Sequence, residues 1–124
     1  MTKSIILCVD DEESPRMLRR LVLQKQGYEV VDVSSGKEAL EALTTTHFDL
    51  VLTDQMMPGM VGTELARQIK LRTPNKPVLI ISGVNELPAD IAYADRFISK
   101  IAGPEALFKD IAELLDVSSN IGKP

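Results

Sequence analysis

The stretch Ile5-Ile6-Leu7-Cys8-Val9 is a continuous apolar run that ends in the acidic pair Asp10-Asp11. It is rich in Ile and does not alternate with polar residues, a pattern that is typical of a strand buried on both faces. Both faces of a strand are covered when helices pack on each side of a parallel sheet. This stretch therefore predicts an α/β fold with a parallel sheet.

Four further short apolar runs support the same fold, at residues 30–33, 50–52, 78–81 and 97–98. Helix-like segments separate them. We expect (βα)5, a doubly wound sheet of five parallel strands, with a short fourth helix at residues 85–94. In the first helical segment, Ser14 followed by Pro15 predicts a cap and a first helical position. Leu18, Leu21 and Val22 predict its buried face.

Two later helices carry equally clear signals. Ser35 and Glu38 have the spacing of a capping box. Gly103-Pro104 opens a segment with an apolar stripe at Leu107, Phe108, Ile111, Leu114 and Leu115. The polar residues 118–124 read as a flexible tail or the start of a linker, so we expect one domain over residues 1–117.

Composition narrows the class of protein. A chain of 124 residues with 44% hydrophobic and 26% charged residues suits one soluble domain. Its net charge of -4 argues against a nucleic-acid module. The lone Cys8 cannot form an internal disulfide, and no stretch reaches the ~20 apolar residues of a membrane span. We therefore expect a cytoplasmic location, with no nucleic-acid or membrane partner for this domain.

Chemically active side chains gather where the predicted strands end. The first strand ends in Asp10-Asp11, the third in Asp54 and the fourth in Ser82, and Lys100 follows the fifth. Ligands of open α/β sheets bind outside the carboxyl ends of the strands. Neighbouring carboxylates repel by roughly 1 to 4 kcal/mol at ~4 Å, and Mg²⁺ relieves such repulsion through oxygen ligands. With Asp54 as a nucleophile and Lys100 and Ser82 near phosphoryl oxygens, the set suits phosphoryl transfer.

The segment from Asp54 to Gly62, DQMMPGMVG, identifies a family. It matches the pattern D-x-x-M-P-x-M-x-G of response-regulator receiver domains, the chemotaxis-regulator-like switches of two-component signalling. The acidic pair, Ser82 and Lys100 complete the resemblance, which spans residues 4–115. It implies a flavodoxin-like sheet with strand order 2-1-3-4-5.

The resemblance also implies a role for each matching residue. Asp54 would be the phosphoacceptor, assisted by Ser82 and Lys100. A Mg²⁺ or Mn²⁺ ion would be held by Asp10, Asp11, Asp54 and the backbone carbonyl of Met56, with Asp10 acting mostly through water. Ser82 and Phe97 would switch together on phosphorylation. The donor would be a histidine kinase or a histidine phosphotransfer protein, and the output a target protein or an attached domain. Such a domain catalyses only its own phosphorylation and slow dephosphorylation, so we do not expect an enzyme acting on other substrates.

Two features depart from the family pattern. Ile101 follows Lys100 where the family usually has Pro after a cis bond, and a cis bond before a non-proline residue costs ~3 to 4 kcal/mol. Either this bond is trans in a rearranged loop or it is cis and strained, and we expect Lys100 to stay in place. Lys100 also follows Ser82 by only 18 residues, fewer than is usual.

Three other functions compete with a receiver. An aspartate-nucleophile phosphohydrolase needs a second acid two residues after the nucleophile, where this chain has Met56. A flavin-binding protein needs a phosphate-cradling loop after the first strand, where the acidic residues would repel phosphate. A docking or dimerisation module that takes no phosphate stays open because of Ile101 and the short fourth helix. We expect a helix face exposed to solvent at Arg16, Arg19 and Arg20.

Overall fold

The computed structural model describes residues 3–83 and 93–121, and side chains as far as residue 117. Its sheet has five parallel strands in the order β2-β1-β3-β4-β5, as the sequence predicted. The strands are β1 (Ile5–Val9), β2 (Glu29–Val33), β3 (Leu50–Asp54), β4 (Val78–Ser82) and β5 (Arg96–Ser99). The helices are α1 (Glu13–Lys25), α2 (Gly36–Thr45), α3 (Gly62–Arg72) and α4 (Pro104–Ile121).

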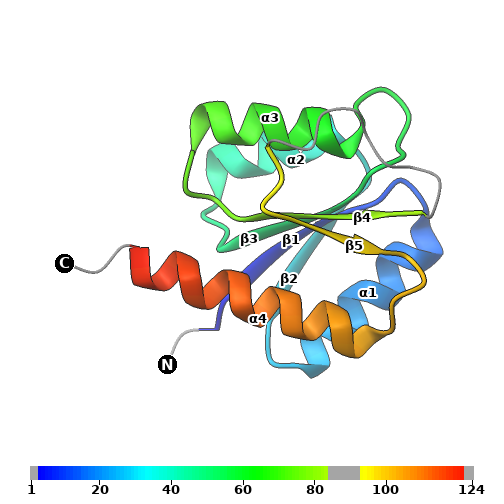
Figure 1. The fold of residues 1–124 in the computed structure, drawn as a ribbon. Helices are drawn as coiled ribbons and strands as arrows, with labels where there is room; N and C mark the ends of the chain where they lie inside the picture. Colours follow the sequence, from blue (N-terminus) through cyan, green and yellow to red (C-terminus); the bar gives the residue numbers. More distant parts are fainter. Residues whose placement is uncertain (1–2, 84–92, 122–124) are drawn as a thin grey trace.

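Helices cover both faces of the sheet (Figure 1). Helices α2 and α3 lie on one face, and α1 and α4 lie on the other. Alternate residues of each central strand enter one of two cores, so Leu7 packs towards α2 and α3 while Ile6 packs towards α1 and α4. All five residues of β3 and of β4 are buried, which explains why these segments show no polar alternation.

The start and the rotation of α1 differ from the prediction. The helix begins one residue before Ser14, and its N-terminal cap is Glu12, whose backbone N–H donates to Oδ1 of Asp10. Leu18 and Leu21 are 63% and 53% exposed, so the predicted buried face is wrong for both. Leu23, which was not in the predicted face, is the fully buried residue of this helix.

Ion pairs account for that rotation. Nε of Arg16 and Nη1 of Arg20 each lie 3.0 Å from a carboxylate oxygen of Asp32 at the end of β2. Together with the burial of Leu23, these contacts place the arginine side of α1 towards the sheet and leave Leu18 and Leu21 mostly exposed. A periodic apolar pattern does not contain this information, because Asp32 lies on another element.

The other helices follow their sequence signals, with one exception. The backbone N–H of Glu38 donates to Oγ of Ser35 at 3.1 Å, which confirms Ser35 as the cap, and the Glu38 carboxylate accepts from the hydroxyl of Ser34 at 2.6 Å. Ile111 and Leu114 are buried as predicted. However, α4 continues to Ile121, so residues 118–121 of the expected tail are helical. No Gly or Pro interrupts the chain between Pro104 and Ile121, which is why the helix does not end at residue 117.

The predicted short helix at residues 85–94 falls almost entirely outside the described residues. Among the described helices, none is both long and apolar enough to cross a membrane.

Candidate functional site

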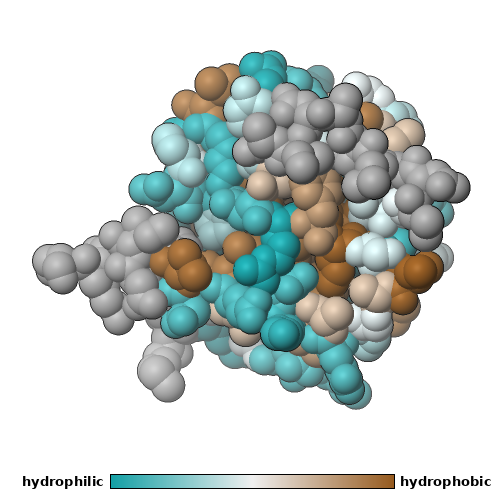
Figure 2. All heavy atoms as spheres, in the orientation of Figure 1, coloured by the Kyte–Doolittle hydropathy of each residue, from teal (hydrophilic) through white to brown (hydrophobic). Residues whose placement is uncertain are grey.

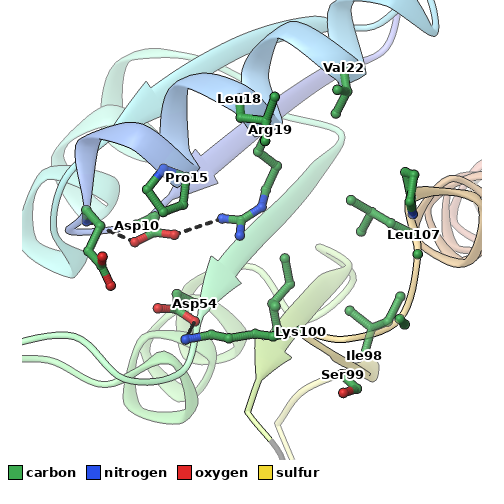
Figure 3. A pocket seen from close by; sticks show the side chains of 15 residues that line it. Asp10, Pro15, Leu18, Arg19, Val22, Asp54, Ile98, Ser99, Lys100 and Leu107 are labelled. Atoms are coloured by element: carbon green, nitrogen blue, oxygen red, sulfur yellow. Dashed lines mark hydrogen bonds and ion pairs between the residues drawn. The ribbon is translucent and has the colours of Figure 1, made fainter.

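The carboxyl ends of β1, β3 and β5 open into a cavity of about 500 Å³ beneath α1 (Figure 3). Asp10 and Asp54 line its floor, and Lys100 enters from the loop after β5. Leu18 of α1 and Leu107 of α4 form part of its apolar wall. The parallel sheet thus brings together residues that lie far apart in the chain, as expected for the carboxyl edge.

Three carboxylates form the acidic part of the site. One oxygen from each of Asp10, Asp11 and Asp54 lies within 4.8 Å of the others. Asp10 and Asp54 are each only 2% exposed, whereas Asp11 is exposed to solvent. Two buried like charges at this spacing are costly unless cations accompany them.

Lys100 is one such cation. Its Nζ lies 3.2 Å from Oδ1 of Asp54. That oxygen is buried and has no hydrogen-bond partner among the described residues, so the contact is an ion pair without hydrogen-bond alignment. Burial raises the pKa of Asp54, the hydrogen-bonding capacity and charge of Lys100 lower it, the charge of Asp10 raises it, and the net shift is upward.

The loop that carries Lys100 resolves the question posed by Ile101. No peptide bond in the described residues is cis, so the bond between Lys100 and Ile101 is trans. The backbone N–H of Lys100 donates to the carbonyl of Ser82 at 2.9 Å, and that of Ile101 donates to Oγ of Ser99 at 3.2 Å. These two bonds hold the loop, and Lys100 keeps the predicted position beside Asp54.

The segment after Asp54 is held by close packing. A Cβ at Gly62 would lie 2.6 Å from the backbone oxygen of Asp54, so only glycine fits there. The side-chain oxygen of Gln55 accepts from the backbone N–H of Thr63 at 2.9 Å and thereby caps α3. Gly59 has a φ of 81°, a conformation that glycine adopts without strain. The motif residues therefore fix the backbone around Asp54.

The remaining predicted residues lie at the edge of the site. Ser82 is buried at the end of β4 but does not line the cavity in the described part of the chain. Phe97 is half-buried in β5, pairs in register with Ile80, and packs on the core beneath α2 and α3. The side chain of Met56 is 53% exposed, in line with a position where only the backbone carbonyl would act.

The donor set suits a hard divalent cation. The three side chains that could ligate a metal, Asp10, Asp11 and Asp54, all offer carboxylate oxygens, the ligands that Mg²⁺ prefers. The buried Oδ1 of Asp54 has lone pairs that no described hydrogen-bond donor occupies. Both observations fit a metal at this edge of the sheet.

Comparison with known proteins decides the family. Residues 6–112 match the family described as "Response regulator receiver domain". This chain belongs to the response-regulator receiver domains. Such domains belong to two-component systems, which confirms the prediction from the DQMMPGMVG motif.

Relatives of this receiver domain include larger regulators. It is 39% identical over 92 residues to the DNA-binding transcriptional regulator NtrC of Klebsiella pneumoniae, covering 74% of this chain and 20% of NtrC. It is 32% identical over 118 residues to the transcriptional regulatory protein GlrR of Escherichia coli K12, covering 92% of this chain and 27% of GlrR. The chain therefore spans about a fifth to a quarter of the length of these relatives.

Solved structures share the fold of this receiver domain. A receiver domain protein from Clostridium thermocellum has a TM-score of 0.89 at 28% identity, covering 95% of this chain and 98% of that one. The response regulator TrrA of Thermotoga maritima, in complex with Mg²⁺ and BeF, has a TM-score of 0.84 at 30% identity, covering 90% and 98%. TrrA has also been solved with the histidine kinase ThkA, where the TM-score is 0.82 at 31% identity over the same shares.

One residue of this receiver's site escaped the sequence analysis. Arg19 is not part of a solvated face: its side chain is 14% exposed, and its Nη1 lies 3.0 Å from Oδ2 of Asp10. Arg19 precedes the buried Leu23 by four residues, the spacing of one helix face. That spacing was the available signal, but Leu18 and Leu21 obscured it by predicting a different inward face.

Proposed function

We propose that this receiver domain accepts a phosphoryl group on Asp54 from a phosphohistidine donor and thereby switches a protein-interaction surface. One observation carries the proposal: Asp54 lines the cavity, and its buried Oδ1 has Lys100 at 3.2 Å and no hydrogen-bond partner among the described residues. A carboxylate held in this way keeps a lone pair for attack. Lys100 is placed to meet the negative charge of an incoming phosphoryl group.

A divalent cation, Mg²⁺ or Mn²⁺, completes the site in this proposal. Asp11 and Asp54 would hold it directly, together with the backbone carbonyl of Met56, and Asp10 would act mostly through water. When bound, the ion supplies positive charge that offsets the repulsion between the carboxylates and the phosphoryl oxygens.

The transfer itself needs little else from the protein. A carboxylate oxygen of Asp54 attacks phosphorus, so that an O–P bond forms while the N–P bond to the donor imidazole breaks. The electron pair of the broken bond goes to the imidazole nitrogen. Lys100 stays beside the phosphoryl oxygens, and the Ser82 hydroxyl turns towards them. Phe97, which pairs with Ile80 of the adjacent strand, would change rotamer as Ser82 moves. Water then releases phosphate slowly, so the domain acts on itself and on no other substrate.

The surroundings of the cavity support a protein donor. The exposed apolar residues Met17, Leu18 and Leu21 all lie on α1, which roofs the site. Figure 2 shows hydrophobic surface on the side of the molecule where α1 lies in Figure 1. A histidine kinase or histidine phosphotransfer protein that brings phosphohistidine to Asp54 must cover this surface. Apolar contacts there would hold the donor in place.

The output is proposed from the relatives alone. A downstream target protein or an attached output domain would read the switched surface, as expected of a receiver that occupies part of a larger regulator. We propose that the receiver unit extends to the end of α4 at Ile121, and not only to residue 117, and that it lies in the cytoplasm. This domain itself would contact neither nucleic acid nor membrane.

Intact-mass measurement tests the proposal. The protein is incubated with acetyl phosphate and Mg²⁺, and compared with Asp54→Asn and with Asp49→Asn, a matched change near the other end of β3. Wild type and Asp49→Asn should gain one phosphate, which EDTA prevents, and Asp54→Asn should gain none. A folded wild-type protein without any adduct would instead favour the phosphate-independent docking or dimerisation module.

A further inference from the structure

The three arginines of α1 divide between two carboxylates. Arg16 and Arg20 both pair with the carboxylate of Asp32 at the end of β2, whereas Arg19 pairs with the carboxylate of Asp10. Arg16 reaches Asp10 only at its backbone carbonyl, to which Nη1 donates at 3.0 Å. The contact between Arg19 and Asp10 is the more buried, with side chains 14% and 3% exposed. Figure 3 shows the guanidinium of Arg19 directed from α1 onto Asp10, across the cavity from Lys100.

This ion pair makes the three carboxylates unequal. Both oxygens of Asp10 have partners, since Oδ1 accepts from the backbone N–H of Glu12 at 2.9 Å and Oδ2 lies 3.0 Å from Nη1 of Arg19. Oδ1 of Asp54 has no hydrogen-bond partner among the described residues. Asp11 is exposed. A cation that approaches the cluster therefore meets Asp10 with both oxygens hydrogen-bonded, Asp54 with only an ion pair from Lys100 at Oδ1, and the exposed Asp11.

We propose that Arg19 is a built-in competitor of the divalent cation at Asp10, which weakens cation binding and leaves the ion to Asp11 and Asp54. The inference rests on the metal site of the proposed function. Arg19 acts through Asp10 and is a positioning residue.

Electrostatics gives the direction of the effect. Arg19 neutralises one of three clustered carboxylates, and its positive charge also repels a dication at the same cluster. Because the pair is largely excluded from solvent, water and salt screen this repulsion only weakly. Removal of the guanidinium should free Oδ2 of Asp10 and strengthen cation binding.

Isothermal titration calorimetry with Mg²⁺ tests the proposal on the intact chain. The dissociation constant of Arg19→Leu is compared with that of wild type and of Arg20→Leu, which removes the same charge from the same helix but from the pair with Asp32. We expect Arg19→Leu to bind Mg²⁺ at least about fivefold more tightly. Arg20→Leu measures the effect of net charge alone and should change binding much less.

Two further variants of Arg19 test whether loss of its positive charge causes the tighter binding. Arg19→Gln keeps a polar side chain if Arg19→Leu does not fold, and it should also bind Mg²⁺ more tightly. Arg19→Lys keeps the cation and should stay close to wild type. Unchanged or weaker binding by Arg19→Leu and Arg19→Gln would overturn the inference, because a merely structural arginine gives no gain in affinity.

These experiments distinguish a wrong prediction about Arg19 from a wrong metal site. If wild type still takes a Mg²⁺-dependent phosphate while neutral variants of Arg19 bind Mg²⁺ no better, only the competition is wrong. If no variant binds Mg²⁺ and no phosphate adduct forms, the metal site of the proposed function is wrong and the inference falls with it.

Discussion

Asp49 and Asp95 at the amino end of the sheet differ from Asp54 at the carboxyl end in the hydrogen bonds that their carboxylates accept. At the amino end, Oδ2 of Asp49 accepts from the backbone N–H of Ile5 at 2.7 Å, and Oδ2 of Asp95 accepts from that of Val78 at 2.7 Å. Asp95 also binds Nζ of Lys70 at 2.6 Å. At the carboxyl end, Oδ1 of Asp54 is buried without a hydrogen-bond partner among the described residues.

This difference in hydrogen bonding distinguishes carboxylates that stabilise the fold from a carboxylate that is available for chemistry. Carboxylates at the amino end satisfy backbone donors at strand starts, so they stabilise the fold and have little capacity left for a ligand. The carboxylate at the carboxyl end lacks such bonds, which costs stability and keeps it available for chemistry. The bonds of the carboxylate thus decide what each of these aspartates does, since Asp10, also at the carboxyl end, has both oxygens occupied.

The largest effect is expected from Lys100. Lys100→Ala should slow phosphorylation by acetyl phosphate about 10²- to 10³-fold, because a cation at the transferring group is lost. The fold should persist, since this side chain lies over the cavity. Time courses of intact mass measure the rate. Lys70→Ala, which removes a lysine from its pair with Asp95 at the opposite end, should leave that rate within about twofold.

Gly62→Ala tests how much the close packing of Gly62 against the backbone of Asp54 contributes to stability and phosphorylation. Gly62→Ala would place Cβ 2.6 Å from the backbone oxygen of Asp54 and 3.0 Å from Cα of Gln55, neither of which can move freely. We expect a loss of about 1–3 kcal/mol in the free energy of unfolding, together with slower phosphorylation. Gly103→Ala, where no atom lies within 4 Å of the new Cβ, is the control for urea denaturation.

Changes at the two ends of β3 should shift stability in opposite directions. Without divalent cations at pH 7, Asp54→Asn should raise the free energy of unfolding by about 1 kcal/mol, since a buried charge is removed. Asp49→Ala should lower it by about 1–2 kcal/mol, because the N–H of Ile5 loses its acceptor. Denaturation of both variants in EDTA provides the measurement.

The pH dependence follows from the pKa of Asp54. Burial raises that pKa, so the folded state is penalised once the carboxyl ionises and the penalty is fully present at neutral pH. The gain from Asp54→Asn should therefore shrink as the pH falls and vanish below the ordinary Asp pKa of about 3.9. A gain that is equal at pH 3.5 and pH 7 would contradict the assignment of the buried charge.

The smallest effect concerns Cys8, between the two ends in β1. Burial raises the pKa of its thiol to about 11. At pH 9 only about one folded molecule in a hundred would carry a thiolate, so alkylation by iodoacetamide should be slow until the protein unfolds. Labelling measured with and without urea checks this. Rapid labelling of the folded protein would show that β1 is less protected than its burial indicates.

Much of this architecture could be predicted from local signals. The run at residues 5–9, the motif from Asp54 to Gly62 and the capping box at Ser35 each depend on neighbouring residues, and the structure confirms the elements they predict. Asp10, Asp11, Asp54 and Lys100 also converge as expected, because a parallel sheet brings its carboxyl ends to one edge, whereas Ser82 does not line the cavity in the described part of the chain.

The features that could not be predicted from the sequence depend on contacts between residues far apart in the chain. The rotation of α1, with Leu18 and Leu21 outside, follows the ion pairs of Arg16 and Arg20 with Asp32. The place of Arg19 in the site follows its pair with Asp10. These contacts join α1 to two different strands, and no periodicity within the helix reveals them.

The most direct test of the central claim locates the phosphoryl group. After incubation with Mg²⁺ and acetyl phosphate, borohydride reduces an aspartyl phosphate to homoserine, and peptide mass spectrometry identifies the residue. We predict homoserine at position 54 alone, with Asp10, Asp11, Asp49 and Asp95 unchanged. Homoserine at any of those positions, or none at position 54 in a protein that gained one phosphate, would contradict the account.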